Sequence, residues 1–439
     1  MTVEIRSSPM SISEYKLGIV FRYSRANIFS YHSLIGALEI NPHLSDIHVF
    51  IPKPEEFLQE INRLLDIEQF NNLIIGISVH SFQMSDIHQL LTILNSHPKR
   101  NRLFIIAGGP HPSALPGELL NNGCDAVVIG EGEKTFPELV LALRNHDLIT
   151  RLKGIAFLNN EREVVIRPKN KPIILDEYPP FAPNYELYSA LEITRGCKFG
   201  CTYCQVPSLF GKTIRYRSPE NAIKWGKFLL SKRETWDFRF ITPNAFGYGS
   251  KKSSEPNVNY IKKLLSGLKK LEAKKRRRIY FGTFPSEVRP ESVTEDTLNL
   301  TKEYCDNDNL TMGAQSGSPK ILKKIKRGHT VEQAINAVDL ANDFGFVMNV
   351  DFILGFPEET IEEQYETIDL CKQLIAKNCR IHMHYLIPLP GTKYFNSKPT
   401  SIALEILKTI RKWSNDGVIF GSWQHQYNLV RNNTNDSKN

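Results

Sequence analysis

The chain has 439 residues, of which 41% are hydrophobic and 23% are charged. This composition is typical of a folded protein of two or three domains and excludes a disordered chain. The formal net charge of +8 suits an anionic ligand but does not by itself indicate nucleic acid.

The sequence also indicates the cellular compartment of the protein. No stretch approaches the roughly 18 apolar residues of a membrane span. Charged residues at Glu4, Arg6 and Glu14 stand where a signal peptide would need an apolar run. Seven cysteines are too few for a disulfide framework in a chain of this length. We therefore predict a cytoplasmic protein with reduced thiols and no membrane span.

Apolar runs alternate with amphipathic stretches over residues 1–150. This pattern predicts a parallel sheet with helices on both faces. The predicted strands are 17–21, 47–51, 73–79, 103–107 and 126–129, and the predicted helices are 55–65, 84–94, 116–121 and 134–143. The fold class is therefore α/β, beginning with a doubly wound domain of the Rossmann or flavodoxin type.

Polar or glycine-rich turns follow three of these strands. The carboxyl ends of parallel strands share one sheet edge, and glycine lets a backbone approach a ligand closely, so the turns predict a shared ligand crevice. Each turn alone is also typical of an ordinary α/β protein. The candidate binding residues are Ser78, Gly108, Gly109, His111, Gly130 and Glu131.

The rest of the chain divides into three parts. Residues 151–188 are predicted to form a hairpin and a proline-rich linker, and residues 396–439 a C-terminal extension with a helix at 402–413 and a disordered tail from Asn432. Residues 189–395 resume the alternation, with strands predicted at 191–194, 238–242, 278–283, 310–313, 347–353 and 381–386 and helices at 221–230, 260–271, 331–344 and 361–376. Six such units suit a partial barrel better than a closed eight-stranded one.

Three cysteines, Cys197, Cys201 and Cys204, follow the first strand of this second domain with the spacing CxxxCxxC. Thiolates are the ligands of iron–sulfur clusters, and a loop with this spacing reaches three corners of a cubane. The fourth iron is left for a small molecule, which indicates chemistry. A structural zinc site is the alternative, but it normally needs four ligands.

Two other segments carry open interpretations. The basic run 274–278 is predicted to be a solvated turn before a strand, with a phosphate site as the alternative. The loop 243–249, rich in glycine and aromatic residues, follows the second strand of the barrel. Because loops at that end of a barrel carry function, we predict that it contacts substrate.

The cysteine loop resembles that of the radical S-adenosylmethionine (radical SAM) superfamily. Several other segments are similar, in order and spacing, to motifs of the branch with an N-terminal cobalamin-binding domain: residues 313–318, 326–330 and 351–360 to the barrel motifs, and 107–112 and 125–133 to the cobalamin-binding domain. The resemblance covers both domains. It implies a cobalamin-binding-type domain followed by a partial (β/α)6 radical SAM barrel.

One departure concerns the cobalt ligand. The wider cobalamin fold carries DxHxxG, whereas this chain has Ser30, His32 and Gly36, with the glycine one position late. His32 is therefore predicted to be a packing or surface histidine. Many members of this branch lack the ligating histidine, so cobalamin binding is still expected.

The resemblance also implies roles for individual residues. Cys197, Cys201 and Cys204 would hold a 4Fe-4S cluster, S-adenosylmethionine would chelate its open iron, and reductive cleavage would give a 5′-deoxyadenosyl radical. Tyr203 would shield the cluster or contact adenine. The remaining cofactor candidates are Gln315 and Ser316 for the ribose or carboxylate, Arg327 for the carboxylate or as a surface cation, and Gly355 and Pro357 near adenine.

Three polar residues are predicted within the apolar strands of the barrel. Asp351 would be costly to bury alone, so it should bond a neighbour or face the lumen. His382 and His384 alternate on the sixth strand and therefore share a face. They are either proton acceptors in the lumen or paired core histidines.

The leading functional hypothesis is a cobalamin-dependent methyltransferase that acts on an unactivated carbon. The first alternative keeps the radical step for rearrangement, carbon–carbon coupling or sulfur insertion without cobalamin, and the second is a non-catalytic metal-binding interaction protein. An electron donor such as ferredoxin or flavodoxin is expected. The substrate, a small molecule or a lipid, is not specified by the sequence, which shows no clear nucleic-acid module.

Overall fold

The computed structural model describes residues 15–251 and 255–436, with side chains through residue 431. The charged residues weighed against a signal peptide, Glu4, Arg6 and Glu14, lie outside this range. The chain divides into an amino-terminal unit that ends at Ser189 and a barrel unit that begins at Ala190.

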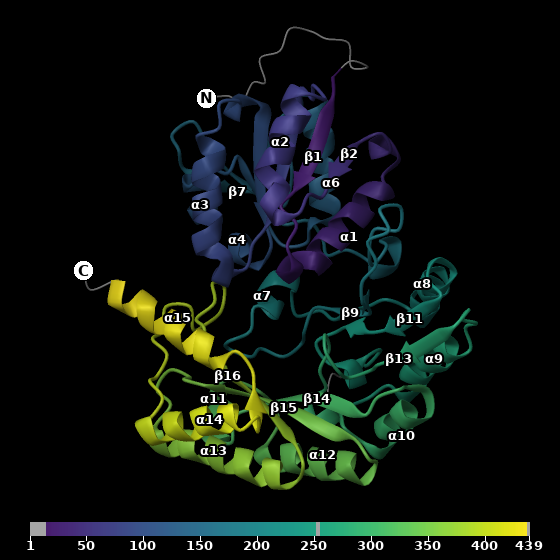
Figure 1. Cartoon of the computed structure of the whole chain (residues 1–439), viewed down its shortest axis with the longest axis vertical. Coiled ribbons are helices and arrows are strands. Elements are labelled where there is room, and N and C mark those ends of the chain that lie inside the picture. The colour runs from purple at the N-terminus through teal and green to yellow at the C-terminus, as the bar shows by residue number, and fades with distance from the viewer. Residues whose placement is uncertain (1–14, 252–254, 437–439) are drawn as a thin grey trace. The chain divides into compact units, whose positions relative to one another are not determined.

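The amino-terminal unit is built on one seven-stranded sheet with the order β2-β1-β3-β4-β5-β6-β7 (Figure 1). The pairs from β2 to β5 are parallel, and β6 and β7 add an antiparallel hairpin at one edge. The strands are β1 Leu17–Phe21, β2 His48–Phe50, β3 Asn72–Ser78, β4 Leu103–Gly108, β5 Ala126–Val128, β6 Ile155–Leu158 and β7 Val164–Ile166. The helices are α1 Ile28–Glu39, α2 Phe57–Asp66, α3 Met84–Asn95, α4 Pro110–Ala114, α5 Pro116–Asn121 and α6 Gly132–Arg144.

Helices cover both faces of this sheet. Apolar residues of α2, α3 and α5 pack with alternate residues of β3 and β4, such as Ile75 and Ile105, on one face. Residues of α1 and α6 pack on the other face against Leu17, Ile19 and Phe21. The order 2-1-3-4-5 places the topological switch point between β1 and β3, which is where doubly wound sheets bind ligands.

Helix α1 was not predicted from the sequence. Its apolar residues are spread around the helix rather than in one stripe, and Asn27 makes no side-chain cap. Helix α1 packs closely against a segment that is distant in the sequence. A Cβ atom at Gly36 would lie only 2.4 Å from the carbonyl oxygen of Phe181.

The barrel unit is built mainly from pairs of parallel strands. The strands are β8 Leu191–Glu192, β9 Thr194–Arg195, β10 Arg215–Tyr216, β11 Thr235–Phe238, β12 Phe240–Ile241, β13 Arg276–Ile279, β14 Asn309–Gln315, β15 Val347–Leu354, β16 Arg380–Tyr385 and β17 Ile419–Phe420. The helices are α7 Val206–Phe210, α8 Pro219–Lys232, α9 Val258–Lys269, α10 Glu295–Tyr304, α11 Pro319–Lys324, α12 Val331–Asp343, α13 Ile361–Ala376, α14 Leu404–Asn415 and α15 Trp423–Asp436.

Parallel pairing runs β8·β12, β11·β13 and then β14-β15-β16-β17. A parallel bridge between Val288 and Met312 links the segment after β13 to β14. Helices α12 and α13 contact β15 and β16 along their outer side (Figure 1). This is the expected partial barrel, with β17 as an unpredicted addition at its end.

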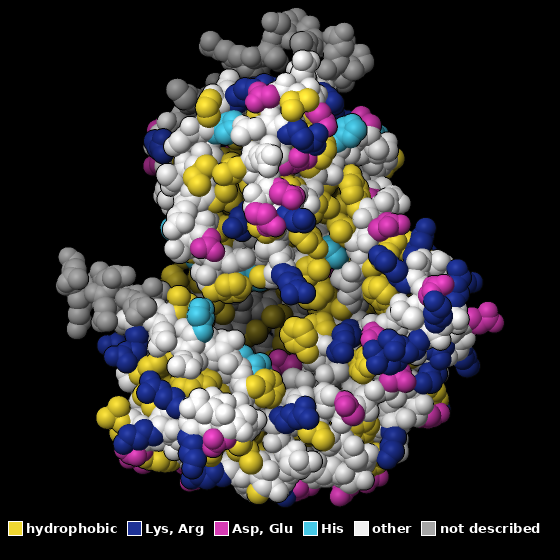
Figure 2. All heavy atoms as spheres, viewed as in Figure 1, with side chains coloured by type: hydrophobic (Ala, Val, Ile, Leu, Met, Phe, Trp, Pro, Cys, Tyr) yellow, Lys and Arg dark blue, Asp and Glu magenta, His cyan; other side chains and the backbone are white. Residues whose placement is uncertain are grey.

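The structure corrects the interpretation of the basic run. Lys274 and Lys275 precede the strand as predicted, but Arg276, Arg277 and Arg278 form most of β13. Their backbones pair with β11, and the side chain of Arg278 pairs with Asp237. Lys and Arg side chains gather over the region of α8, α9, β11 and β13 (Figure 2). The predicted strand to residue 283 ends at Ile279, ahead of Gly282 with its φ of +73°.

The tail prediction also needs correction. Helix α15 continues through Asp436, beyond the start of the predicted disordered tail at Asn432. Residues 437–439 lie outside the described range. Within the part of the chain that the structure describes, none of the helices combines the length and the apolar character needed to cross a membrane.

Candidate active site

The three thiols lie on a loop that two short strands close at its base. Strand β9 ends at Arg195 and pairs with β10 in antiparallel register, so the intervening segment folds back on itself. Gly196 has a φ of +85°, and a Cβ atom there would lie 2.4 Å from the carbonyl oxygen of Thr213. Only glycine fits this turn, which starts the loop one residue before Cys197.

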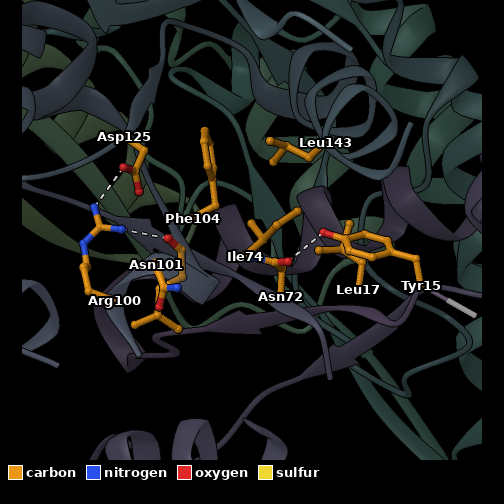
Figure 3. Close-up of a pocket in the computed structure, with 10 residues that line it drawn as sticks. Tyr15, Leu17, Asn72, Ile74, Arg100, Asn101, Phe104, Asp125 and Leu143 are labelled. Atoms are coloured by element: carbon orange, nitrogen blue, oxygen red, sulfur yellow. Dashed lines mark hydrogen bonds and ion pairs between the residues drawn. The ribbon is translucent and has the colours of Figure 1, made fainter. Parts of the chain in front are cut away.

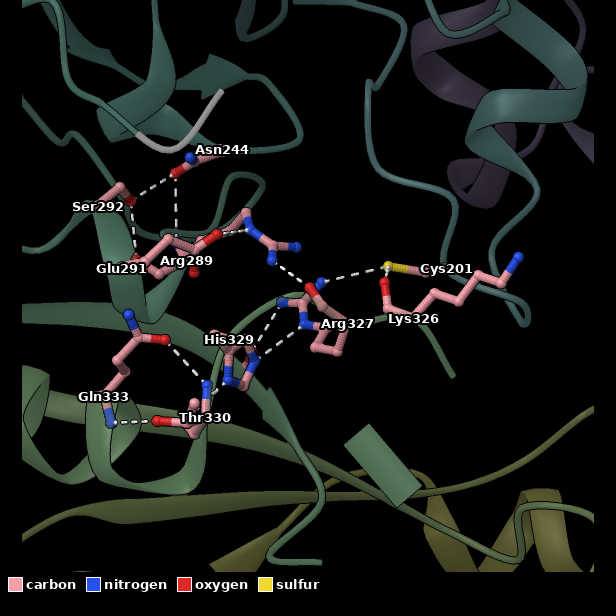
Figure 4. A network of polar contacts seen from close by, with 11 residues as sticks. Cys201, Asn244, Arg289, Glu291, Ser292, Lys326, Arg327, His329, Thr330 and Gln333 are labelled. Carbon is pink, nitrogen blue, oxygen red and sulfur yellow. Dashed lines mark hydrogen bonds and ion pairs between the residues drawn. The ribbon is translucent and has the colours of Figure 1, made fainter. Parts of the chain in front are cut away.

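Two buried guanidinium groups stand beside this loop (Figure 4). Arg327 approaches the Cys201 Sγ atom at 3.9 Å through Nη1 and donates to the Gly313 carbonyl at 2.7 Å through Nη2. Arg289 donates to the Arg327 carbonyl and lies 3.4 Å over the ring of Phe199 within the loop. Arg327 is 7% exposed, so its prediction as a surface cation is wrong.

The polar chain around the two arginines is continuous. The Asn244 amide oxygen accepts from the Arg289 backbone N–H at 3.2 Å, and Arg327 Nε contacts His329 Nε2 at 3.2 Å. Burial, and then the Arg327 cation, lower the pKa of His329 to about 3, so this imidazole is neutral. Sequence reasoning missed Arg289 and gave His329 no role, because the resemblance implied a role for neither residue.

The donor set fits a metal cluster. Burial raises the pKa of Cys204 to about 11 and also raises that of Cys197, so these thiols are protonated before metal binds. Metal ions deprotonate coordinating thiols, and three thiolates bring negative charge into the loop. The guanidinium groups of Arg289 and Arg327 offset that charge.

The adenine-side candidates form an apolar wall. The ring centroids of Tyr203 and Phe356 lie 5.8 Å apart, within a buried cluster that includes Tyr394. Gly355 has a φ of +87°, and a Cβ atom there would lie 2.3 Å from the ring of Tyr385. Its N–H donates to the Glu359 carboxylate at 2.8 Å.

The other candidates near the end of the barrel strands have different surroundings. The Pro357 carbonyl accepts from Lys324 Nζ at 2.6 Å. Gln315 is buried, with a φ of +74° at an irregularity in β14. Ser316 Oγ lies 3.1 Å from Thr367 Oγ1 and accepts from the Ser318 N–H at 3.1 Å, so its hydroxyl is held within the protein.

The polar residues of β15 and β16 come together. Asp351 and His382 are register partners, and Asp351 Oδ1 lies 2.9 Å from His382 Nδ1. His384 Nε2 lies 3.3 Å from the same His382 nitrogen. Glu287, which sequence reasoning missed, is hydrogen-bonded to Asp351, and burial, followed by the Asp351 charge, raises its pKa to about 7. The prediction that Asp351 bonds a neighbour is therefore confirmed.

A second polar network lies at the switch point of the amino-terminal sheet. Asn27, which follows β1, donates through Nδ2 to the Ser78 carbonyl at 2.9 Å and to Ser78 Oγ at 3.2 Å. The Ser78 N–H donates to the Tyr31 hydroxyl at 3.0 Å, and Gln83 Nε2 donates to Asn27 Oδ1 at 2.8 Å. The prediction found Ser78 but missed Asn27, Tyr31 and Gln83, which carry no motif.

Glycines let the backbone at this edge of the amino-terminal sheet lie close to neighbouring segments of the same chain. Gly109 has a φ of +101°, and a Cβ atom there would lie 2.9 Å from the Val79 carbonyl oxygen. A Cβ atom at Gly108 would meet its nearest neighbour, on Val128, at 3.8 Å, and the Gly130 N–H donates to Ser113 Oγ at 2.9 Å. Small polar groups and bare backbone at a switch point fit a large cofactor such as cobalamin.

The remaining candidates of this unit have internal partners. His111 contacts Ser81 Oγ at 3.0 Å and Glu118 Oε2 at 2.9 Å. Glu131 accepts from the Ile173 N–H at 3.1 Å. His32 is buried, with its Nε2 atom 2.9 Å from the Tyr23 hydroxyl, which confirms it as a packing histidine.

Two other features concern the loop 243–249 and a cavity in the amino-terminal unit. The aromatic residues Phe246 and Tyr248 of loop 243–249 are fully buried and pack inside the barrel unit, so a contact of this loop with substrate stays a prediction for its other residues. A cavity of about 140 Å³ lined by Asn72, Arg100 and Asp125 (Figure 3) lies near the amino ends of the strands, opposite the predicted crevice.

Comparisons with known proteins identify both domains. Residues 191–371 match the radical SAM superfamily and residues 34–140 match the B12 binding domain. A protein of Pyrococcus horikoshii described as an uncharacterized methyltransferase is 30% identical over 345 residues, covering 74% of this chain and 69% of the relative. A putative methylthiotransferase of Methanocaldococcus jannaschii is 31% identical over 257 residues, covering 56% of this chain and 53% of the relative.

A solved structure shows the same fold. The radical S-adenosylmethionine methyltransferase TsrM from Kitasatospora setae, with cobalamin and a [4Fe-4S] cluster bound, gives a TM-score of 0.64 at 16% identity, covering 86% of this chain and 76% of TsrM. The fold and the thiol loop define a two-domain iron–sulfur enzyme. The chain belongs to the radical SAM superfamily, in the branch with an N-terminal B12-binding domain.

Proposed function

We propose that this enzyme is a cobalamin-dependent methyltransferase that acts on an unactivated carbon. The observation that carries the proposal is the combination, in one chain, of a three-thiol loop beside two buried guanidiniums and a doubly wound domain with a polar switch point. The similarity to a protein described as a methyltransferase supports the transferred group.

The barrel residues would hold and orient the cofactors. Cys197, Cys201 and Cys204 would bind the cluster, which would supply the electron for reductive cleavage of S-adenosylmethionine. Arg327 would offset the negative charge of the thiolates, because its Nη1 atom lies 3.9 Å from Cys201 Sγ. Tyr203 and Phe356 would exclude water from one side of the loop.

The amino-terminal unit would hold cobalamin at the carboxyl ends of β1, β3, β4 and β5, and the bound cofactor would supply the methyl group. Gly108 and Gly130 would admit the cofactor close to the backbone. Asn27 would keep Ser78 in place through its two hydrogen bonds. The electron would come from a small redox protein of the ferredoxin or flavodoxin type.

Sulfur insertion is the competing reaction, favoured by the similarity to a putative methylthiotransferase. Such chemistry would recruit a second cluster. The other cysteines of the described chain lie on separate segments, with Cys371 in α13 and Cys124, Cys305 and Cys379 in the connections after α5, after α10 and before β16. Burial raises the pKa of each of these thiols. They do not form a second ligand set, so methyl transfer is the better proposal.

The proposal is tested by replacing one thiol of the loop. Cys201→Ala should abolish the cluster, the release of 5′-deoxyadenosine from S-adenosylmethionine and the methylated product together, measured by iron content and by chromatography after reduction. Cys305→Ala, which removes a thiol outside the loop, should retain all three. Cleavage activity that survives in Cys201→Ala would overturn the proposal.

A further inference from the structure

A second group of metal-ligand side chains lies on the barrel strands, separate from the cysteine loop in sequence. Asp351 on β15 and His382 and His384 on β16 place one ligand atom each within 4.8 Å of one another. The adjacent strands fix this arrangement, because Asp351 is the register partner of His382 and alternate residues of β16 share a face.

The distances approach those of a metal site. Asp351 Oδ1 and His382 Nδ1 lie 2.9 Å apart, and His382 Nδ1 and His384 Nε2 lie 3.3 Å apart. Neighbouring ligands around an ion with bonds of about 2.0–2.2 Å stand roughly 3.0–3.5 Å apart. The remaining pair lies within 4.8 Å, so a small side-chain rotation brings all three donors to one ion.

Hydrogen bonds alone do not satisfy all the donors and acceptors of Asp351, His382 and His384. Nδ1 of His382 faces both Asp351 and His384, yet one ring nitrogen is either a donor or an acceptor. If it donates to Asp351, it offers no lone pair to His384. A cation between the three atoms would accept one lone pair from each of Asp351 Oδ1, His382 Nδ1 and His384 Nε2.

We propose that Asp351, His382 and His384 bind a divalent transition-metal ion. Two imidazoles and one carboxylate are a known ligand set for such ions. Three protein ligands leave coordination positions open, which is typical of metal sites that also bind a small molecule, whereas structural zinc sites use four. The site is distinct from the cysteine cluster, since its ligands are nitrogen and oxygen rather than sulfur.

The surroundings of His384 give a specific test. Metal binding through Nε2 puts the ring proton on Nδ1, which faces Gln426 Nε2 at 3.3 Å, while Gln426 Oε1 accepts from the Tyr385 N–H at 2.9 Å. A glutamate at position 426 has two acceptor oxygens, one for each N–H. Gln426→Glu should therefore tighten metal binding by about 10-fold or more, as carboxylate partners of ligating histidines do.

The experiment measures zinc in the reconstituted full-length enzyme. We expect one zinc per chain, with nitrogen and oxygen ligands at about 2.0–2.1 Å and no sulfur at about 2.3 Å in X-ray absorption at the zinc edge. His382→Ala should lose this zinc and keep its iron, which shows that the barrel is folded. His425→Ala, which removes an exposed histidine beside Gln426, should keep both metals.

Several results would overturn the proposal. These are wild-type enzyme that takes up no zinc from micromolar solution, zinc with sulfur ligands, and zinc that His382→Ala retains. If His382→Ala loses iron as well, the Gln426→Glu variant decides: weaker or unchanged zinc affinity would contradict the site, and tighter binding would support it.

Discussion

The two units of this enzyme bury their polar groups in different ways. The sheet of the amino-terminal unit packs apolar residues on both faces and keeps its network of Asn27 and Ser78, neutral groups, at the strand ends. The barrel unit buries charged groups, among them Arg289, Arg327 and Glu359. We infer that the switch-point site of the amino-terminal unit depends on backbone shape, and that the site at the cysteine loop of the barrel unit depends on charge.

The largest effect should follow from removing the central charge of the barrel. Arg327→Met keeps most of the side-chain volume but leaves the Gly313 carbonyl without its 2.7 Å donor and, once a cluster binds, the Cys201 thiolate without its cation. Losing one partner of a buried charged contact costs about 3–5 kcal/mol. Iron content should fall, and any cluster that forms should have a lower reduction potential.

Lys323→Met is the matched control for this prediction, because it removes an exposed cation from the same segment. It should leave iron content and potential unchanged. An Arg327→Met enzyme with the iron content and potential of the wild type would show that charge does not set the barrel site.

A smaller effect should appear at Glu359. Burial raises the pKa of this carboxyl from its ordinary value of 4.5 to about 7, although it accepts from the Gly355 N–H. The folded protein therefore holds a proton that the unfolded chain has lost, and stability falls as the pH rises from about 4.5 through 7. Glu359→Gln keeps the acceptor and removes the titration, so it should raise the free energy of unfolding by about 3 kcal/mol above pH 7 and by little near pH 4.5.

Denaturant titrations at several pH values check this prediction. Glu358→Gln, on the exposed neighbouring side chain, should show no such gain at high pH. A gain for Glu359→Gln that is the same at all pH values would contradict the raised pKa.

The smallest effect concerns backbone shape in the amino-terminal unit. Gly109→Ala puts a Cβ atom 2.9 Å from the Val79 carbonyl at a φ of +101°, which should cost about 1–3 kcal/mol. Gly108→Ala meets its nearest atom at 3.8 Å and should be nearly neutral. Equal unfolding midpoints for the two variants would show that shape is not limiting at this edge.

Local patterns predicted much of the fold. Strand β1 has the predicted bounds Leu17–Phe21, because a short apolar run bounded by polar residues identifies a buried strand. The three cysteines and the pair His382 and His384 were also found, since each set lies on one loop or one strand. Helix α1 was missed because apolar residues surround it without a period.

Contacts between distant segments were beyond sequence reasoning. Arg289 reaches Arg327 across 38 residues, and Asn27 reaches Ser78 across 51. These contacts depend on strand register and helix packing, which no local pattern specifies. The same limit applies to the loop 243–249, where the sequence did not show that Phe246 and Tyr248 are buried.

The cofactor content of the 439-residue chain tests the proposed cobalamin-dependent methyltransferase most directly. The protein would be purified without oxygen, reconstituted with iron, sulfide and hydroxocobalamin, desalted, and analysed for iron and cobalt. We predict about four irons and one cobalt per chain, as one cubane cluster and one cobalamin require. About four irons without cobalt would contradict the cobalamin-dependent methyltransferase and leave a radical enzyme whose first unit serves another purpose.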